Sequence, residues 1–330
     1  MKALKFKPIA SALGVTLSHP YEGYVSFTSS PYTPHVAWSA VDLSTSTKFG
    51  DEALSPVEGK VERIVKASSG AGPYERLDYM ISIKPRRSEK VRVKVMHVKP
   101  AVKAGDHVVE EDLLGRYIRT NYFSYHHVPH LHVEVCRDTS LRPTRAAPLT
   151  PLLPLSEKPS LKKLKVVVDK VEESFALCSL ENGGLGITCT IGASRRRALL
   201  NGQLGVRAEY LGLLGLRDVE INDPVKVAGS EVAYVKSQLG DRAIAITSRS
   251  LSFKSWLRKL QRAYLSRNEA PKPRVKVTST EAQVRGVELL LSKRWQVKLI
   301  PYQGRSWGEE LRGKRLELSL SLRRSRTRLS

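Results

Sequence analysis

The sequence predicts a mainly β protein, with a closed or sandwiched β architecture in its N-terminal part. Short runs rich in Val and Ile alternate there with Gly, Pro and Ser, a pattern typical of strands joined by turns. Hydrophobic residues make up 41% and charged residues 26% of the chain, as in globular proteins. A length of 330 residues allows two or three domains, each with its own core.

The N-terminal strands are expected where these apolar runs occur between turn-forming residues. The most probable domain boundary follows them, in residues 142–159, whose five prolines suit an extended connector better than a central strand or a helix. We therefore expect a first domain at 1–141 and a linker at 142–159. The expected strands are Tyr24–Thr28, Ala40–Leu43, Gly59–Lys66, Tyr79–Lys84, Val91–Val98, His107–Val109, Leu113–Arg119 and His132–Cys136.

The remainder predicts a β-rich domain at 160–250, for which the sequence indicates no role, and a basic α+β unit at 251–330. A short helix is expected near Ser194–Leu200. In the last unit the apolar spacing predicts helices at Phe253–Ser266 and Glu281–Ser292. The strands expected after the linker are Leu164–Val171, Ala176–Ser179, Gly186–Ile191, Val206–Leu213, Val225–Val227, Glu231–Lys236, Arg242–Thr247, Arg274–Thr278, Trp295–Pro301 and Lys314–Leu322; a basic tail, Arg323–Ser330, follows.

The positive charge is concentrated near the C-terminus. The net charge is +23, and residues 251–330 hold 20 Lys and Arg against 6 Asp and Glu, an excess of 14. Such a module suits an anionic polymer, nucleic acid or an anionic lipid surface. A solvated surface of the kind found in thermophilic proteins is the other interpretation, so charge alone does not identify the partner.

We expect no transmembrane segment, since no run approaches the roughly 18 apolar residues of a membrane span, and we expect no secretory signal. We expect a cytoplasmic protein. The three cysteines, Cys136, Cys178 and Cys189, are not at metal-ligand spacing, and we expect them to be buried reduced thiols.

Two histidines mark the candidate site, in the segment Pro129-His130-Leu131-His132-Val133-Glu134-Val135. Side chains alternate across a strand, so His130 and His132 point to the same face, about 6.6 Å apart. Two imidazoles placed in this way can share one reaction centre, where one binds a metal and the other acts as an acid or a base.

This segment resembles the C-terminal signature of the lysostaphin-like zinc endopeptidases, whose fold is the duplicated hybrid motif. Further segments resemble that family in the same order along residues 35–136. They are Val41-Asp42-Leu43, Ser55-Pro-Val-Glu-Gly-Lys-Val-Glu-Arg-Ile64, Val95-Met-His97-Val98 and the stretch from Pro100 to Gly115. Biotinyl and lipoyl carrier domains share two of these hairpins, but the chain lacks a good match to their modified lysine motif.

The resemblance implies a role for each matching residue. Asp42 and His132 would bind Zn²⁺, while His97 and His130 would carry out acid–base work on a peptide or peptide-like substrate. The family's remaining ligand is a histidine four residues before the aspartate, and this chain has Trp38 there. Indole cannot bind zinc as imidazole does.

His35 is the nearest replacement for that ligand. It lies seven residues before Asp42, and this odd separation would place its side chain on the face of a regular strand opposite to that of Asp42. Trp38, four residues before Asp42, would instead share the face of Asp42. His35 could still reach the metal from an irregular loop or through a bulge. Two further histidines, His126 and His127, could line a substrate cleft or act as ligands, although we expect partly exposed loop residues.

Two functions remain open from the sequence. The first is a zinc metallopeptidase with its metal on Asp42, His132 and His35. The second is a non-catalytic binding or scaffold protein that keeps the peptidase-like groove and binds an anionic partner, such as nucleic acid, through residues 251–330. Trp38 favours the second, and the four matching polar residues favour the first.

Overall fold

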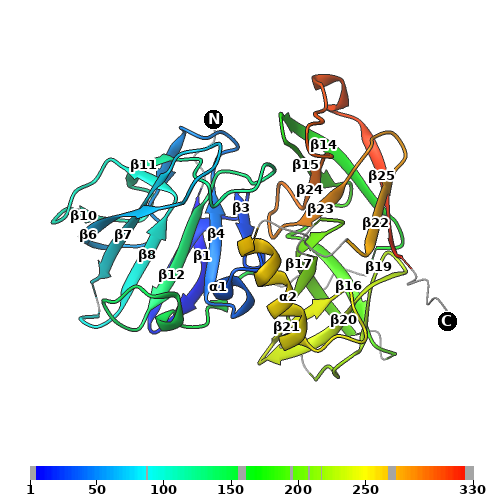
Figure 1. Cartoon of the computed structure of the whole chain (residues 1–330), viewed down its shortest axis with the longest axis horizontal. Coiled ribbons are helices and arrows are strands. Elements are labelled where there is room, and N and C mark those ends of the chain that lie inside the picture. The colour runs from blue at the N-terminus through cyan, green and yellow to red at the C-terminus, as the bar shows by residue number, and fades with distance from the viewer. Residues whose placement is uncertain are drawn as a thin grey trace. The chain divides into compact units, whose positions relative to one another are not determined.

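Figure 1 shows the computed structural model of the chain, which describes residues 5–86, 88–154, 161–193, 196–206, 209–216, 218–266 and 273–323. The chain forms two compact units. Unit 1 comprises Met1–Phe27, Tyr32–Pro154 and Leu291–Trp295, and unit 2 comprises Thr28–Pro31, Leu155–Leu290 and Gln296–Ser330. Strands predominate in both units, which confirms the mainly β fold class.

Unit 1 is built around a seven-stranded antiparallel sheet in the order β10-β6-β7-β8-β12-β4-β3. Two three-stranded sheets, β13-β1-β2 and β5-β11-β9, accompany it. The elements are β1 (Phe6–Ala12), β2 (Val15–Pro20), β3 (Tyr24–Ser26), α1 (Thr33–Val36), β4 (Ala40–Ser44), β5 (Glu52–Leu54), β6 (Gly59–Ser68), β7 (Leu77–Pro85), β8 (Arg92–Met96), β9 (Val98–Pro100), β10 (His107–Val108), β11 (Leu113–Tyr117), β12 (Leu131–Cys136), the 3₁₀ turn η1 (Pro143–Arg145) and β13 (Thr150–Pro151).

The central strand β12 determines where the polar side chains of unit 1 meet. It pairs with β4 on one side and β8 on the other, and all six of its residues are buried. Leu131, Val133 and Val135 alternate with His132 and Glu134, so the sheet buries apolar side chains on one face and polar side chains on the other. Buried polar groups need partners, and the neighbouring strands supply them.

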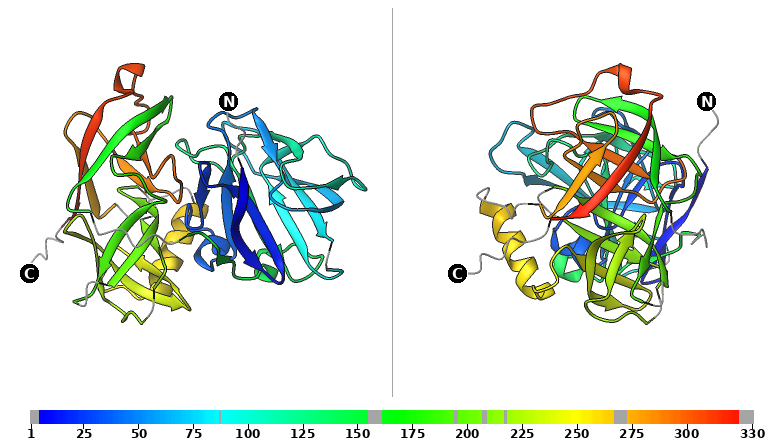
Figure 2. Two further views of the ribbon diagram at one scale, coloured as in Figure 1. Left: turned by 180° about the vertical axis from the view of Figure 1, so that it is seen from behind. Right: turned by 90° about the vertical axis from the view of Figure 1, so that its right-hand side faces the viewer.

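Unit 2 contains one antiparallel sheet of twelve strands in the order β16-β19-β20-β21-β18-β17-β23-β24-β15-β14-β25-β22. An additional pairing of β16 with β17 closes six of them into a ring, drawn green to yellow-green in Figures 1 and 2. The elements are β14 (Leu164–Glu172), β15 (Phe175–Leu180), β16 (Ile187–Ile191), β17 (Arg196–Leu204), β18 (Tyr210–Leu214), β19 (Pro224–Val227), β20 (Ser230–Leu239), β21 (Arg242–Ile246), α2 (Phe253–Ser266), β22 (Val275–Ser279), β23 (Gly286–Leu289), β24 (Val297–Ile300), the 3₁₀ turn η2 (Glu309–Leu311) and β25 (Arg315–Leu322).

Two of the helices predicted from the sequence are not formed, and those predictions are wrong. The segment expected as Ser194–Leu200 lies in β17 from residue 196 onward, and its first two residues are outside the described part. Glu281–Ser292 contains strand β23, which is buried between β17 and β24. A continuous apolar run is compatible with a buried strand as well as with a helix. A Cβ added to Gly286 would lie only 2.5 Å from Leu204 O, and such a close approach of two backbones is typical of a glycine in a strand.

The regions expected separately at 160–250 and 251–330 contribute strands to the same sheet, with β22 to β25 continuing it beyond β14, β15 and β17. The helix expected at Phe253–Ser266 is α2. Most of the basic tail and the end of the proline-rich linker lie outside the described residues.

Two expectations about the chain as a whole can be compared with the described residues. The three cysteines are free thiols and buried, as expected, and burial raises the pKa of Cys136 and of Cys189 to about 12. Within the described ranges, the helices are too short or too polar for any of them to cross a membrane.

Candidate metal centre

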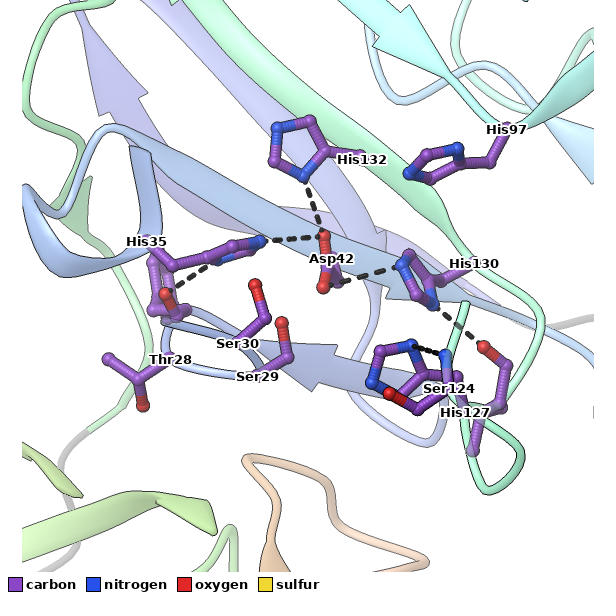
Figure 3. Close-up of polar contacts among 12 residues, drawn as sticks. Thr28, Ser29, Ser30, His35, Asp42, His97, Ser124, His127, His130 and His132 are labelled. Atoms are coloured by element: carbon purple, nitrogen blue, oxygen red, sulfur yellow. Dashed lines mark hydrogen bonds and ion pairs between the residues drawn. The ribbon is translucent and has the colours of Figure 1, made fainter. Parts of the chain in front are cut away.

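Three histidines of unit 1 converge on the carboxylate of Asp42. Asp42 lies in the middle of β4, directly opposite His132 in β12. His130 precedes β12 by one residue, and His35 lies in α1. Figure 3 shows the three imidazoles arranged around the carboxylate, all of them buried.

The distances place possible ligand atoms close together. Asp42 Oδ1 lies 3.0 Å from His132 Nδ1 and 3.4 Å from His35 Nε2. One atom from each of these three residues lies within 4.8 Å of the others. Ligand atoms bound to one tetrahedral zinc ion lie roughly 3.3 Å apart, given zinc–ligand bonds of about 2.0 to 2.1 Å. The donor set therefore has the chemistry and nearly the spacing that zinc requires.

Each imidazole is held by a second partner that orients it. His35 Nδ1 donates to Phe27 O at 2.9 Å, and His130 Nδ1 donates to Val128 O at 2.7 Å. His132 donates from Nε2 to Glu134 Oε1 at 2.9 Å. In each case the other ring nitrogen faces Asp42. This is the arrangement in which metal-binding histidines are usually held, with one N–H fixed by a carbonyl or carboxylate.

Two of these contacts bring acceptor atoms face to face. In the tautomer that carries a proton on Nδ1 alone, His35 and His130 would turn an unprotonated Nε2 toward the carboxylate, each at 3.4 Å. Such an arrangement is favourable when a proton or a metal cation lies between the acceptors. His130 faces Oδ2 of Asp42, whereas His35 and His132 face Oδ1.

Burial and mutual contacts shift the pKa values of the cluster in opposite directions. Burial by itself would raise the pKa of Asp42, but the charges of His130 and His35 and hydrogen bonds from His132 and His35 hold it well below its usual value. Burial lowers the pKa of His130 to about 4. Burial also opposes the charging of His132, but hydrogen bonds to Asp42 and Glu134 outweigh it and raise its pKa to about 9.

The structure explains how His35 reaches the cluster and corrects two expectations. Residues 33–36 form a helical turn, so strand alternation does not apply to His35. Trp38 does not share a strand face with Asp42, because it precedes β4 and adopts a positive φ of 58°. Its indole is buried, with its ring centroid 6.1 Å from that of Phe27.

Comparisons with known proteins find one family model that is similar to this region. Residues 13–154 match the family described as "Domain of unknown function (DUF8155) N-terminal domain". No curated protein matches the chain. Among solved structures it is similar to "A Novel M23 Metalloprotease Pseudoalterin from Deep-sea", at 16% identity and a TM-score of 0.23, over 41% of this chain and 72% of that chain.

His97 lies beside the cluster and is fixed by Asp78. Its Nδ1 donates to Asp78 Oδ2 at 2.5 Å, and its backbone N–H donates to Asp78 Oδ1 at 3.0 Å. The backbone of His97 has a positive φ of 71°. Its ring centroid lies 5.5 Å from that of His130 and 6.0 Å from that of His132. Four of the sequence-predicted site residues thus lie together with Asp42.

Asp78 is the completely buried carboxylate of this second pair. It also accepts from Thr120 Oγ1 at 3.1 Å and from its neighbour's backbone, Tyr79 N, at 2.7 Å. Burial by itself would raise the pKa of Asp78, but the charge and hydrogen bonds of His97 and the other donors lower it. Asp78 therefore stays ionised and holds the imidazole of His97 in one orientation.

The loop that leads into His130 contacts the cluster through an aromatic side chain. The ring centroid of Phe123 lies 4.8 Å from those of both His97 and His130. His127 is half-buried, and its ring centroid lies 6.0 Å from that of His130. His126 is buried, contrary to the expectation of a partly exposed loop residue, and it packs against Tyr125 and His127.

Sequence reasoning missed three residues that support the site. Glu134 follows His132 by two positions on the same strand and so shares its face, a signal that alternation alone could have revealed. Lys94 is a charged residue within the apolar run of β8, which also could have marked it. For Asp78, we find no comparable signal in the sequence.

Proposed function

We propose that unit 1 is a zinc-dependent hydrolase that cleaves peptide or peptide-like substrates. The observation that carries the proposal is the orientation of three buried imidazoles, each held by a second partner and each turning its remaining nitrogen toward Asp42. Structural ion pairs do not need three imidazoles around one carboxylate. In a metal site, second partners of this kind fix the orientation of the imidazoles that bind the ion.

His35, Asp42 and His132 are the residues that would hold the ion. A zinc ion bound by three protein ligands supplies Lewis acidity, which lowers the pKa of water and polarises a carbonyl group. The peptide character of the substrate rests on the resemblance of residues 35–136 to the lysostaphin-like endopeptidases.

The two remaining histidines are suited to move protons. The pKa of His130 is lowered to about 4 by burial, so its imidazole is neutral near pH 7 and its Nε2 can accept a proton. Because the Nδ1–H of His97 donates a hydrogen bond to Asp78, the Nε2 of His97 is left to accept a proton or, after protonation, to donate one. Phe123 packs against both rings and helps to exclude water from them.

The metal content of the purified full chain tests the proposal. We expect about one zinc per chain by elemental analysis after dialysis against zinc, and its loss in Asp42→Ala and in His35→Ala. His107→Ala is the matched control, because His107 is an exposed histidine of the same unit, in β10. Circular dichroism would verify that each variant folds.

A folded wild-type chain that does not take up zinc would refute the proposed hydrolase function. The alternative would then be a binding or scaffold protein with an anionic partner such as nucleic acid. One feature of unit 2 favours that partner, since α2 buries Trp256 and Leu260 while exposing Lys254, Arg258 and Lys259.

A further inference from the structure

A buried ion pair lies directly behind His132. Glu134 in β12 is opposite Lys94 in β8, and Lys94 Nζ lies 2.6 Å from Glu134 Oε1. The side chains are 3% and 0% exposed, respectively. The same Oε1 atom accepts the Nε2–H of His132 at 2.9 Å. A chain of charged groups therefore runs from Lys94 through Glu134 and His132 to Asp42.

Stability alone does not account for this pair. Removing two charges from water costs about as much as their attraction returns, so a buried ion pair adds little net stability over apolar side chains of the same size. Glu134 instead fixes the orientation of the His132 imidazole. Of the two ring nitrogens of His132, it takes Nε2–H and leaves Nδ1 toward Asp42.

Lys94 allows the carboxylate of Glu134 to lie near a second carboxylate, that of Asp42. Oε1 of Glu134 faces both the ammonium group of Lys94, at 2.6 Å, and the Nε2–H of His132, at 2.9 Å. Lys94 also donates to Leu141 O at 3.4 Å, which ties its ammonium group to the backbone. The pair carries no net charge, so Glu134 orients the imidazole without adding a second negative charge to the site of Asp42.

We propose that Lys94 and Glu134 are positioning residues of the metal centre, which select Nδ1 of His132 as the metal-binding nitrogen. This inference rests on the proposed zinc site, but the orientation of His132 can be measured without any metal. The pair acts through His132 and does not itself touch the metal or the substrate.

Two double variants of the full chain separate orientation from charge. Lys94→Met with Glu134→Met removes the pair and leaves Nε2 of His132 without its acceptor. Lys94→Met with Glu134→Gln also removes both charges but keeps a carbonyl oxygen that can accept Nε2–H. The matched control is Lys298→Met with Glu288→Met, which removes a buried cross-strand Lys–Glu pair of unit 2.

The first measurement uses metal-free, ¹⁵N-labelled protein. We expect a solvent-protected Nε2–H resonance for His132 in the wild type, in the Gln double variant and in the control, and its loss in the Met double variant. A resonance that persists unchanged in the Met double variant would overturn the proposal, because another group would then orient the ring. This result holds whether or not the protein binds zinc.

The second measurement is zinc affinity by competition with a chelator. We expect the Met double variant to bind zinc about 10- to 100-fold more weakly than the wild type, and the Gln double variant to recover most of that loss. Equal affinity in the wild type and the folded Met double variant would show that the pair is only structural. A wild type that binds no zinc would refute the proposed function, while the resonance of His132 would still decide the positioning role.

Discussion

Unit 1 should lose stability in mild acid because of His19, a histidine outside the metal centre. His19 lies in β2 and is 3% exposed, and its Nε2 donates to Ser44 O at 3.1 Å. The ring is tightly enclosed, since a Cβ added to Gly23 would lie 2.5 Å from Nε2. Burial lowers the pKa of His19 from 6.5 to about 4, although the bond to Ser44 partly opposes this.

The direction of the effect follows from where the proton binds. The unfolded chain takes up a proton on His19 below a pH of about 6.5, whereas the folded chain does so only below about 4. The contribution of neutral His19 is therefore present above the unfolded pKa and is lost as the pH falls through this range. The difference in pKa corresponds to about 3 kcal/mol in total, of which about 2 kcal/mol is lost between pH 7 and pH 5.

His19→Gln isolates this contribution, because an amide can still donate to Ser44 O but does not titrate. The free energy of unfolding would be measured in urea at pH 7 and pH 5 with chelator present, following peptides of unit 1 by pulse proteolysis and mass spectrometry. We expect the loss between these pH values to be about 2 kcal/mol greater in the wild type than in the variant. Equal losses would refute the reasoning, since all other titrating groups are common to both proteins.

Two further predictions concern other buried residues. Trp38→His in a His35→Ala background should not restore zinc binding, because residue 38 precedes β4 at a positive φ and packs against Phe27; stoichiometric zinc in that variant would contradict the assignment of His35. Lys298→Met should lower the free energy of unfolding of unit 2 by about 3–5 kcal/mol by leaving Glu288 buried without its lysine, whereas adding Glu288→Met should recover most of the loss in thermal unfolding. A double variant as unstable as the single one would show that the charges themselves are needed.

The sequence predicts the strands of unit 1 well because both signals it uses are local. Alternation of apolar and polar residues, interrupted by Gly and Pro, identifies β4, β6 and β12 to within a few residues. The same alternation places His130 and His132 on one face, and the structure brings both to Asp42. Glu134 belongs to this pattern too, although its partner on β8 does not follow from it.

The sequence is less informative where a neighbouring segment decides the structure. The apolar run within Glu281–Ser292 fits a helix, but β17 and β24 on either side pair with Gly286–Leu289 as a strand. Strand pairing is a long-range property, and no window of the sequence contains the partner.

By itself, the sequence determined the mainly β class and the residues that resemble a zinc peptidase site, because side-chain periodicity and short motifs are local properties. Only the tertiary structure decided how His35 reaches Asp42. His35 lies in the helical turn α1 and not in a strand, so the alternation of strand faces does not apply to it. It also decided the pairing of Lys94 with Glu134, because the register of β8 against β12 sets which side chains lie opposite each other. Trp38, which alone suggested a lost ligand, is instead a core residue beside a site whose three donors lie within reach of one ion.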